Sequence, residues 1–364
     1  MDAQKIFIIF TIYCCQAAGQ NIPTAAQVTA GKTVVKTLID NNVVANEKIF
    51  IPGLVRLAFH DCVGQDHCDG CIDHSLPDNG GLQRYTDDLD PLYNTHKASM
   101  GDISRADFYI LAAYTALEEA TVSQTDKFTG TMKFGRADCP TSPTEDETNT
   151  VFPKATWDFE QAHTFFQSEF GFVDRQESVA ILGAHTLGRT RTDNSGFEGR
   201  WVRGSGAGGV RNTEILDNQY YLQLRGNWTQ KQVAESGMFQ WQRPGTDPNV
   251  KSEAGQGSQP NIMLNVDMGI LFKMDTDIGN GVTPILNENT GENQCLIVVV
   301  SSNCIVGTEC CETSLANTGR ANNNFRRYTK GSSQNTLFIQ DFTAAFRKMT
   351  HDKNNAVRLL QDPL

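Results

Sequence analysis

The sequence predicts a mainly α fold, and three observations support this prediction. Apolar residues recur with the period of an α-helix in seven separate segments, whereas the alternation typical of strands is scarce. The stretches between these segments are rich in turn-forming residues and are expected to be long connections. At 364 residues, the chain is also long enough to bury a sizeable core.

The seven helical segments follow one another along most of the chain. Each carries an apolar stripe at positions i, i+3, i+4 and i+7, which is the pattern of a helix with one buried face. They are Ala25 to Asp40, Gly53 to Cys62, Ile103 to Ala120, Trp157 to Phe170, Arg175 to Leu187, Asn218 to Arg225 and Leu337 to Met349. The clearest strand pattern is Leu296 to Val300.

Turn residues mark the connections between these elements. Long loops are expected at Cys62 to Gly81, Gly135 to Pro153, Gly204 to Gly209 and Gly245 to Pro260. Residues Gly291 to Asn335 are rich in Cys, Asn, Ser and Thr, and we expect a disulfide-tied excursion before the last helix.

Residues 1–19 are predicted to be a secretory signal. Ile6 to Cys15 is an apolar run too short to span a bilayer, with Lys5 before it and small residues after it. Cleavage near Gly19 or Gln20 would leave a secreted, extracellular protein, and the glycosylation sequon at Asn227 agrees with secretion. No later apolar run is long enough for a membrane span.

The cysteine count also fits an oxidising compartment. Of 10 cysteines, two lie in the predicted signal, and the even number that remains suits disulfides. Cys62 with either Cys68 or Cys71 would close a short loop, and the late cluster from Cys295 to Cys311 could pair within itself.

The negative net charge limits the classes of molecule that the protein is expected to bind. The formal net charge is -11, and no block of Lys and Arg interrupts it, so nucleic acid is not expected to bind. A small or cationic partner suits this surface better, and no pattern indicates a particular oligomeric state.

The first candidate site is the pair Arg56 and His60 in the segment Leu54 to Cys62. Their four-residue spacing places both side chains on one face of a helix. An imidazole can move a proton near neutral pH, while a guanidinium stays charged and stabilises a developing anion. This combination suits peroxide chemistry, although the same spacing is also found on solvated helix faces.

The second candidate site is His185, at the end of an apolar helix and flanked by small residues that would let a large planar group approach. Downstream, Asp267 is a single carboxylate in an apolar stretch, where burial alone would be costly. If Asp267 accepts the Nδ1 proton of His185, the imidazole gains basicity as a metal ligand. The alternatives are a satisfied core histidine and a helix-capping aspartate.

Four segments, taken in order, resemble the haem peroxidase superfamily of plants, fungi and bacteria. They are RLAFHDC around His60, GAHTLG around His185, SGFEGRW ending at Trp201 and MLNVDMGIL around Asp267. Lesser agreements extend the resemblance from about Ala25 to Met349. It implies one catalytic domain, residues 20–364, with a two-lobed helical fold: a distal lobe of about 20–155 and a proximal lobe of about 156–350. A Cys-rich insertion at about 290–335 has no counterpart.

The activity that this resemblance implies is that of a haem peroxidase, which reduces hydrogen peroxide to water and oxidises small organic donors through a ferryl intermediate. A response to oxidative stress is the corresponding biological role. Haem b would lie between the lobes, with His185 as the proximal iron ligand and with Arg56 and His60 on the distal side. Asn79 would fix His60 by a side-chain hydrogen bond, unless it only marks a turn.

Two branches of the superfamily are mixed in this chain. Trp201 is similar to cytochrome c peroxidase and ascorbate peroxidase, whereas Phe59 resembles secreted fungal and plant enzymes. Trp201 would either hold an oxidising radical or be an aromatic wall stacked on the proximal imidazole. Lys48 matches the lysine of ascorbate peroxidases, but Asn194 stands where their ascorbate-binding arginine would be. The resemblance therefore implies small phenolic or aromatic molecules, oxidised at the haem edge, as the electron donors.

Oxygen-rich segments on both sides also resemble calcium or other cation sites of secreted peroxidases. The implied ligands are Asp61 and Asp69 on the distal side, and Thr186, Thr213 and Asp217 on the proximal side. Cys71 departs from the pattern because serine is usual at its position. Asp217 could instead cap the helix that follows it.

Two other protein classes remain open. A secreted haem-binding protein without turnover is motivated by the altered calcium loop and by the Cys-rich segment. A zinc or calcium protein without haem would use the donors crowded in one loop, which are His60, Cys62, His67, Cys68 and Cys71.

Overall fold

The computed structural model describes most of the chain between residue 21 and the C-terminus. The described residues are 21–44, 47–64, 67–140, 150–202, 213–224, 228–243, 260–271, 297–299, 309–311, 325–329, 334–355 and 360–364. The predicted signal, the loop Gly204 to Gly209, nearly all of Gly245 to Pro260, and Asn227 lie outside them.

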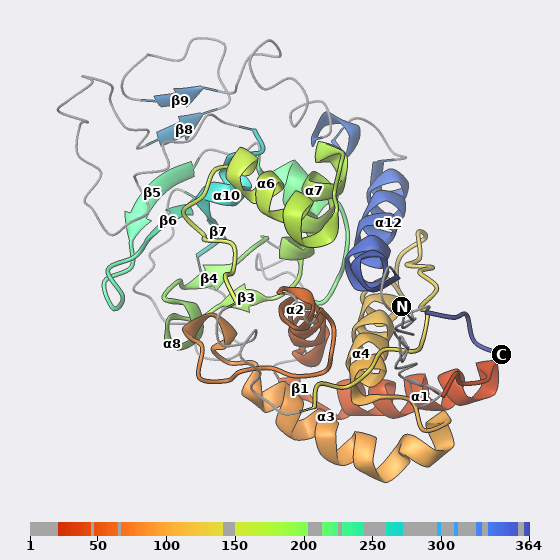
Figure 1. Cartoon of the computed structure of the whole chain (residues 1–364). Coiled ribbons are helices and arrows are strands. Elements are labelled where there is room, and N and C mark those ends of the chain that lie inside the picture. Colours follow the sequence, from red (N-terminus) through yellow and green to blue (C-terminus); the bar gives the residue numbers. More distant parts are fainter. Residues whose placement is uncertain are drawn as a thin grey trace, which may run out of the picture.

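Helices dominate the described residues, as predicted, and each predicted helix overlaps an observed one. The α-helices are α1 (Ala25–Asn41), α2 (Phe50–Cys62), α3 (Gln83–His96), α4 (Arg105–Ala120), α6 (Phe159–Phe170), α7 (Arg175–Leu182), α8 (Thr192–Ser195), α9 (Gln219–Leu224), α10 (Asn265–Met268) and α12 (Gln334–Asn355). Short 3₁₀ turns are η1 (Pro77–Asn79), η2 (Lys97–Met100) and η3 (Gly183–Thr186). Figure 1 shows α1, α3 and α4 at one end of the molecule and α6 and α7 at the other, with α12 beside α7.

Two helix boundaries differ from the prediction for local reasons. The predicted helix from Trp157 begins only at Phe159, because Asp158 forms a capping box with Gln161. The predicted helix Arg175 to Leu187 ends at Leu182 and tightens into η3, so His185 lies on a 3₁₀ turn.

The sheet content exceeds the prediction. A five-stranded sheet has the order β7-β6-β5-β8-β9, in which β8 and β9 are parallel and the other neighbours are antiparallel. Its strands are β5 (Trp228–Gln232), β6 (Phe239–Gln242), β7 (Ile262–Met263), β8 (Ile297–Val299) and β9 (Glu309–Cys311). The predicted strand Leu296 to Val300 is therefore β8, and the Cys-rich insertion adds two strands to this sheet. Two small hairpins pair β1 (Val43–Val44) with β2 (Glu47–Lys48) and β3 (Arg189–Thr190) with β4 (Gly199–Arg200).

Helix α2 presents two different faces. Leu54, Leu57 and Ala58 are fully buried, and the helix packs against α4. Arg56 and His60, by contrast, remain partly accessible. The helix is thus anchored through its apolar face, which holds the functional side chains in fixed positions on the other.

Two disulfides tie the loop that follows α2. Cys62 bonds to Cys68, one of the two expected short loops, and Cys71 bonds to Cys139, 68 residues further along the chain. The proposed zinc site is wrong for this reason: sulfur atoms that are paired with each other cannot serve as thiolate ligands.

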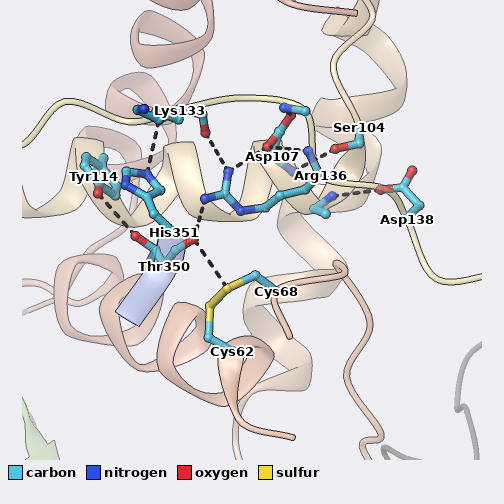
Figure 2. Close-up of polar contacts among 12 residues, drawn as sticks. Cys62, Cys68, Ser104, Asp107, Tyr114, Lys133, Arg136, Asp138, Thr350 and His351 are labelled. Carbon is cyan, nitrogen blue, oxygen red and sulfur yellow. Dashed lines mark hydrogen bonds and ion pairs between the residues drawn. A yellow bond between two sulfur atoms is a disulfide. The ribbon is translucent and has the colours of Figure 1, made fainter. Parts of the chain in front are cut away.

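A buried ion pair joins α4 to the C-terminal helix. Figure 2 shows Arg136 between Asp107 of α4 and Thr350 of α12. The Arg136 Nη1 atom lies 2.8 Å from the Asp107 carboxylate, and Nη2 donates to the Thr350 carbonyl at 2.5 Å. Arg136 is fully buried and Asp107 is 1% exposed.

Among the described residues, no helix is long and apolar enough to cross a membrane.

His351, in the same region, is expected to make folding stability sensitive to acid. Burial first, and then the charge of Arg136, lower the pKa of His351 to about 2. The unfolded chain binds the proton near pH 6.5, so stability is retained above that value and falls as the pH drops towards 2. Between pH 7 and pH 5 the loss from this group should be roughly 2 kcal/mol.

Urea unfolding of the wild type and of His351→Gln at the two pH values measures this effect. Glutamine cannot titrate but can still accept the Lys133 N–H that His351 Nε2 accepts at 3.1 Å. Equal pH dependence in the two proteins would contradict the prediction.

Candidate active site

Arg56 and His60 lie on α2 and contact the same turn, Asp78 to Gly80. Arg56 donates from Nη1 to the Gly80 carbonyl at 2.8 Å and from Nη2 to the Asp78 carbonyl at 2.6 Å. His60 Nδ1 lies 2.7 Å from Asn79 Oδ1. The two side chains share one face of α2, as expected from their spacing, and the turn orients the cation and the imidazole together.

Asn79 determines which nitrogen of His60 carries the proton. Its amide nitrogen donates to the Asp73 carbonyl at 2.8 Å, which turns Oδ1 towards His60. Because a carbonyl oxygen can only accept, His60 must donate from Nδ1, and Nε2 keeps its lone pair. The expected hydrogen bond between Asn79 and His60 is present in addition to the turn.

The surroundings of His60 keep it neutral. Burial and then the nearby Arg56 charge lower its pKa well below the usual value, against a smaller opposing effect of the Asn79 hydrogen bond. The Phe152 ring stacks on the imidazole at 4.6 Å between centroids, and the Phe59 ring meets it edge-on at 5.7 Å. A neutral imidazole with a free Nε2 is able to accept a proton at pH 7.

His185 and Asp267 are brought together across 82 residues, as the sequence predicted. His185 Nδ1 lies 2.7 Å from Asp267 Oδ1, and the carboxylate is fully buried while the imidazole side chain is 30% exposed. The other carboxylate oxygen, Oδ2, accepts the Leu264 N–H at 2.7 Å. The Nδ1 proton is thus committed to Asp267, and Nε2 has a lone pair to offer a metal.

Two aromatic residues flank this second histidine. The Trp201 ring stacks on the His185 imidazole at 3.9 Å with an interplanar angle of 3°, a contact that fits both predicted roles, an aromatic wall and a carrier of an oxidising radical. Tyr220 was not predicted: its hydroxyl donates to Asp267 Oδ1 at 2.7 Å. Burial and the Asp267 charge raise the pKa of Tyr220 well above its usual value, so the phenol keeps its proton. A buried tyrosine needs a partner for its hydroxyl, which was the available signal.

The predicted cation ligands form two groups. Asp61 and Asp69 line one pocket together with Asp73, directly beside His60 and Asn79. Asp61 accepts the Gly70 N–H at 2.8 Å, and Asp69 accepts the Cys71 N–H at 3.0 Å.

On the proximal side, the Thr186 hydroxyl lies 3.4 Å from Asp217 Oδ1. The Thr213 carbonyl accepts the Gly188 N–H. Asp217 also accepts the Gln219 N–H at 3.0 Å, so the helix-capping contact is present as well.

No described contact joins the Lys48 side chain to His60 or to His185. Its ammonium group contacts Asp40 at 2.6 Å and Glu119 at 3.3 Å, which ties β2 to α1 and α4. The lysine that matches ascorbate peroxidases in the sequence thus has a structural role here.

Comparison with known proteins finds similarity to peroxidases. The chain is 31% identical over 204 residues to the mitochondrial cytochrome c peroxidase of Candida glabrata, which covers 53% of this chain and 51% of that protein. It is 30% identical over 190 residues to cytosolic L-ascorbate peroxidase 1 of Oryza sativa subsp. indica, covering 49% of this chain and 66% of that protein. The chain spans about half to two thirds of the length of the curated relatives it matches.

A family model described as Peroxidase matches residues 32–277. This range includes α2 with Arg56 and His60, the turn with Asn79, and the pair His185 and Asp267. Because the match covers more than half of the chain and contains both histidine sites, the chain belongs to the peroxidase family.

Proposed function

We propose that this protein is a haem-dependent peroxidase that reduces hydrogen peroxide to water while oxidising small organic donors. One observation carries the proposal. His60 and His185 each give their Nδ1 proton to a side-chain oxygen, at 2.7 Å in both cases, so both Nε2 atoms keep a lone pair. One imidazole is thereby prepared to accept a proton and the other to bind a metal.

The residues around His185 fit a haem iron. A neutral imidazole whose Nδ1–H is bonded to a carboxylate is a common axial donor for haem iron. His185 is partly accessible although Asp267 and Trp201 behind it are buried, and Ala184 adds little bulk next to it. His185 would therefore hold the iron, with Trp201 packed against its ring.

Haem, when bound, would supply the iron that binds peroxide and would pass to it the two electrons that the organic donors give up, so that with two further protons both oxygens end as water. His60 then takes the peroxide proton at Nε2 and returns it to the departing oxygen, which leaves as water. Arg56 stabilises the negative charge that develops on that oxygen. Asn79 keeps His60 in the required tautomer throughout, and Asp267 does the same for His185.

For the reductant, we propose small phenolic or aromatic donors. Phe59 is half-buried beside His60 and offers aromatic surface on which a flat donor would pack. Ascorbate is less suited, since Lys48 is held by Asp40 and Glu119. Removal of peroxide in this way would serve a response to oxidative stress.

Purified protein loaded with haem tests the proposal. We expect a Soret band and peroxide-dependent oxidation of guaiacol, with lower turnover of ascorbate in a panel of donors. A missing Soret band would refute the haem assignment. A Soret band without peroxide-dependent oxidation would favour the alternative, a haem-binding protein without turnover, which the intact proton-transfer geometry of His60 does not favour.

We also propose that the protein is secreted and carries calcium or another cation. The disulfides Cys62–Cys68 and Cys71–Cys139 support an oxidising compartment. Oxygen ligands from Asp61 and Asp69 in one pocket support a hard cation. Detection of the protein in culture medium and elemental analysis before and after treatment with EGTA would test these two points.

A further inference from the structure

Two donors compete for one oxygen of Asp267. Oδ1 accepts both the His185 Nδ1–H and the Tyr220 hydroxyl, each at 2.7 Å, while Oδ2 accepts the Leu264 N–H at 2.7 Å. Asp267 is fully buried, and among the described residues its side chain has no other hydrogen-bonding partner. The electron density that His185 receives from this carboxylate is therefore divided with Tyr220.

Tyr220 is fixed in this position by its neighbours. It is fully buried on α9, and its ring meets the His185 imidazole edge-on at 6.2 Å and the Tyr221 ring at 4.9 Å. Tyr221 in turn donates its hydroxyl to the Val179 carbonyl of α7 at 2.7 Å. Burial and these ring contacts, which a phenylalanine at position 221 would keep, hold the Tyr220 hydroxyl against Asp267 rather than free to turn away.

We infer that Tyr220 is a positioning residue that weakens the hydrogen bond from His185 to Asp267 and so limits how strongly His185 donates electrons to a bound haem iron. The inference rests on the proposed function. A stronger bond to the carboxylate makes an imidazole a more basic ligand, and hydrogen bonding behind the axial ligand is one means by which proteins adjust haem potentials. The Tyr220 hydroxyl acts against this effect by sharing the same acceptor.

The variant Tyr220→Phe removes the hydroxyl and keeps the ring. With one competing donor gone, the bond between His185 and Asp267 should shorten and His185 should become more basic. We expect the Fe(III)/Fe(II) reduction potential of the haem-loaded variant to shift to more negative values, and the Fe(II)–imidazole stretching frequency in resonance Raman spectra to rise.

Tyr221→Phe is the matched control, because it removes a hydroxyl from the adjacent residue of the same helix, and in the described part of the chain that hydroxyl donates to the backbone carbonyls of Val179 and Ala180. It should leave both the potential and the frequency at wild-type values. A Tyr220→Phe variant with an unchanged potential, or with one shifted to more positive values, overturns the inference.

The same measurements separate this inference from the proposed function. If the wild type binds haem and oxidises guaiacol but Tyr220→Phe behaves like Tyr221→Phe, only the role of Tyr220 is refuted. If the wild type binds no haem, the proposed function fails and the inference fails with it.

Discussion

Replacing His60 by leucine is expected to slow the reaction with hydrogen peroxide by a factor of about 10² to 10⁴, the usual contribution of a positioned acid and base. The imidazole accepts and returns the peroxide proton at Nε2, and leucine can do neither. Haem binding should be unchanged, because His185 and Asp267 lie on different elements from α2. Stopped-flow mixing of the haem-loaded variant with peroxide, together with the Soret spectrum of the resting protein, measures both effects.

His74→Leu provides the control for this substitution. His74 is exposed and bonds to Thr86 at 2.9 Å, so the same chemical change there should leave the reaction with peroxide at the wild-type rate. Asn79→Ala should give a loss smaller than that of His60→Leu, since it frees the tautomer but keeps the base. A His60→Leu rate close to that of the wild type would show that proton transfer does not pass through this histidine.

Local signals in the sequence were sufficient for the parts of the site that lie on one element. The spacing of Arg56 and His60 fixes their common face on any helix, and the apolar residues between them fix which face is buried. The contact between His185 and Asp267 could also be anticipated, because a lone carboxylate in an apolar stretch needs a partner.

The parts that the sequence did not predict depend on long-range contacts. Tyr220 belongs to an apolar stripe, and nothing in its own segment indicates that its hydroxyl meets Asp267, 47 residues away. The bond between Cys71 and Cys139 was one of many possible pairings.

Helix α3 was missed for a local reason. It has many polar residues and contains Pro91, which breaks the usual helical pattern.

Arg136→Met is expected to lower the free energy of unfolding by about 3 to 5 kcal/mol, because it leaves the buried Asp107 carboxylate without its cation. Arg136 also donates to the carbonyls of Lys133 and Thr350, so α12 would lose this bond while it keeps the one between Thr350 Oγ1 and the Tyr114 hydroxyl of α4 at 3.2 Å (Figure 2). Burial already raises the pKa of Asp107, and the Arg136 charge is the main opposing influence. Urea unfolding at constant pH measures the loss.

Arg175→Met is the control that separates the effect of burial from the loss of an ion pair as such. Arg175 pairs with Glu160 at 2.5 Å, but the two side chains are 28% and 49% exposed, so water can replace the lost partner and the loss should be at most about 1 kcal/mol. The double variant Asp107→Asn with Arg136→Met should lose less than the sum of the two single variants, because the amide carries no charge that needs a partner. Equal losses for Arg136→Met and Arg175→Met would mean that the connection between α4 and α12 does not depend on the buried ion pair. A loss confined to the buried pair would instead show that burial sets the cost, because water cannot reach the Asp107 carboxylate to replace the lost cation.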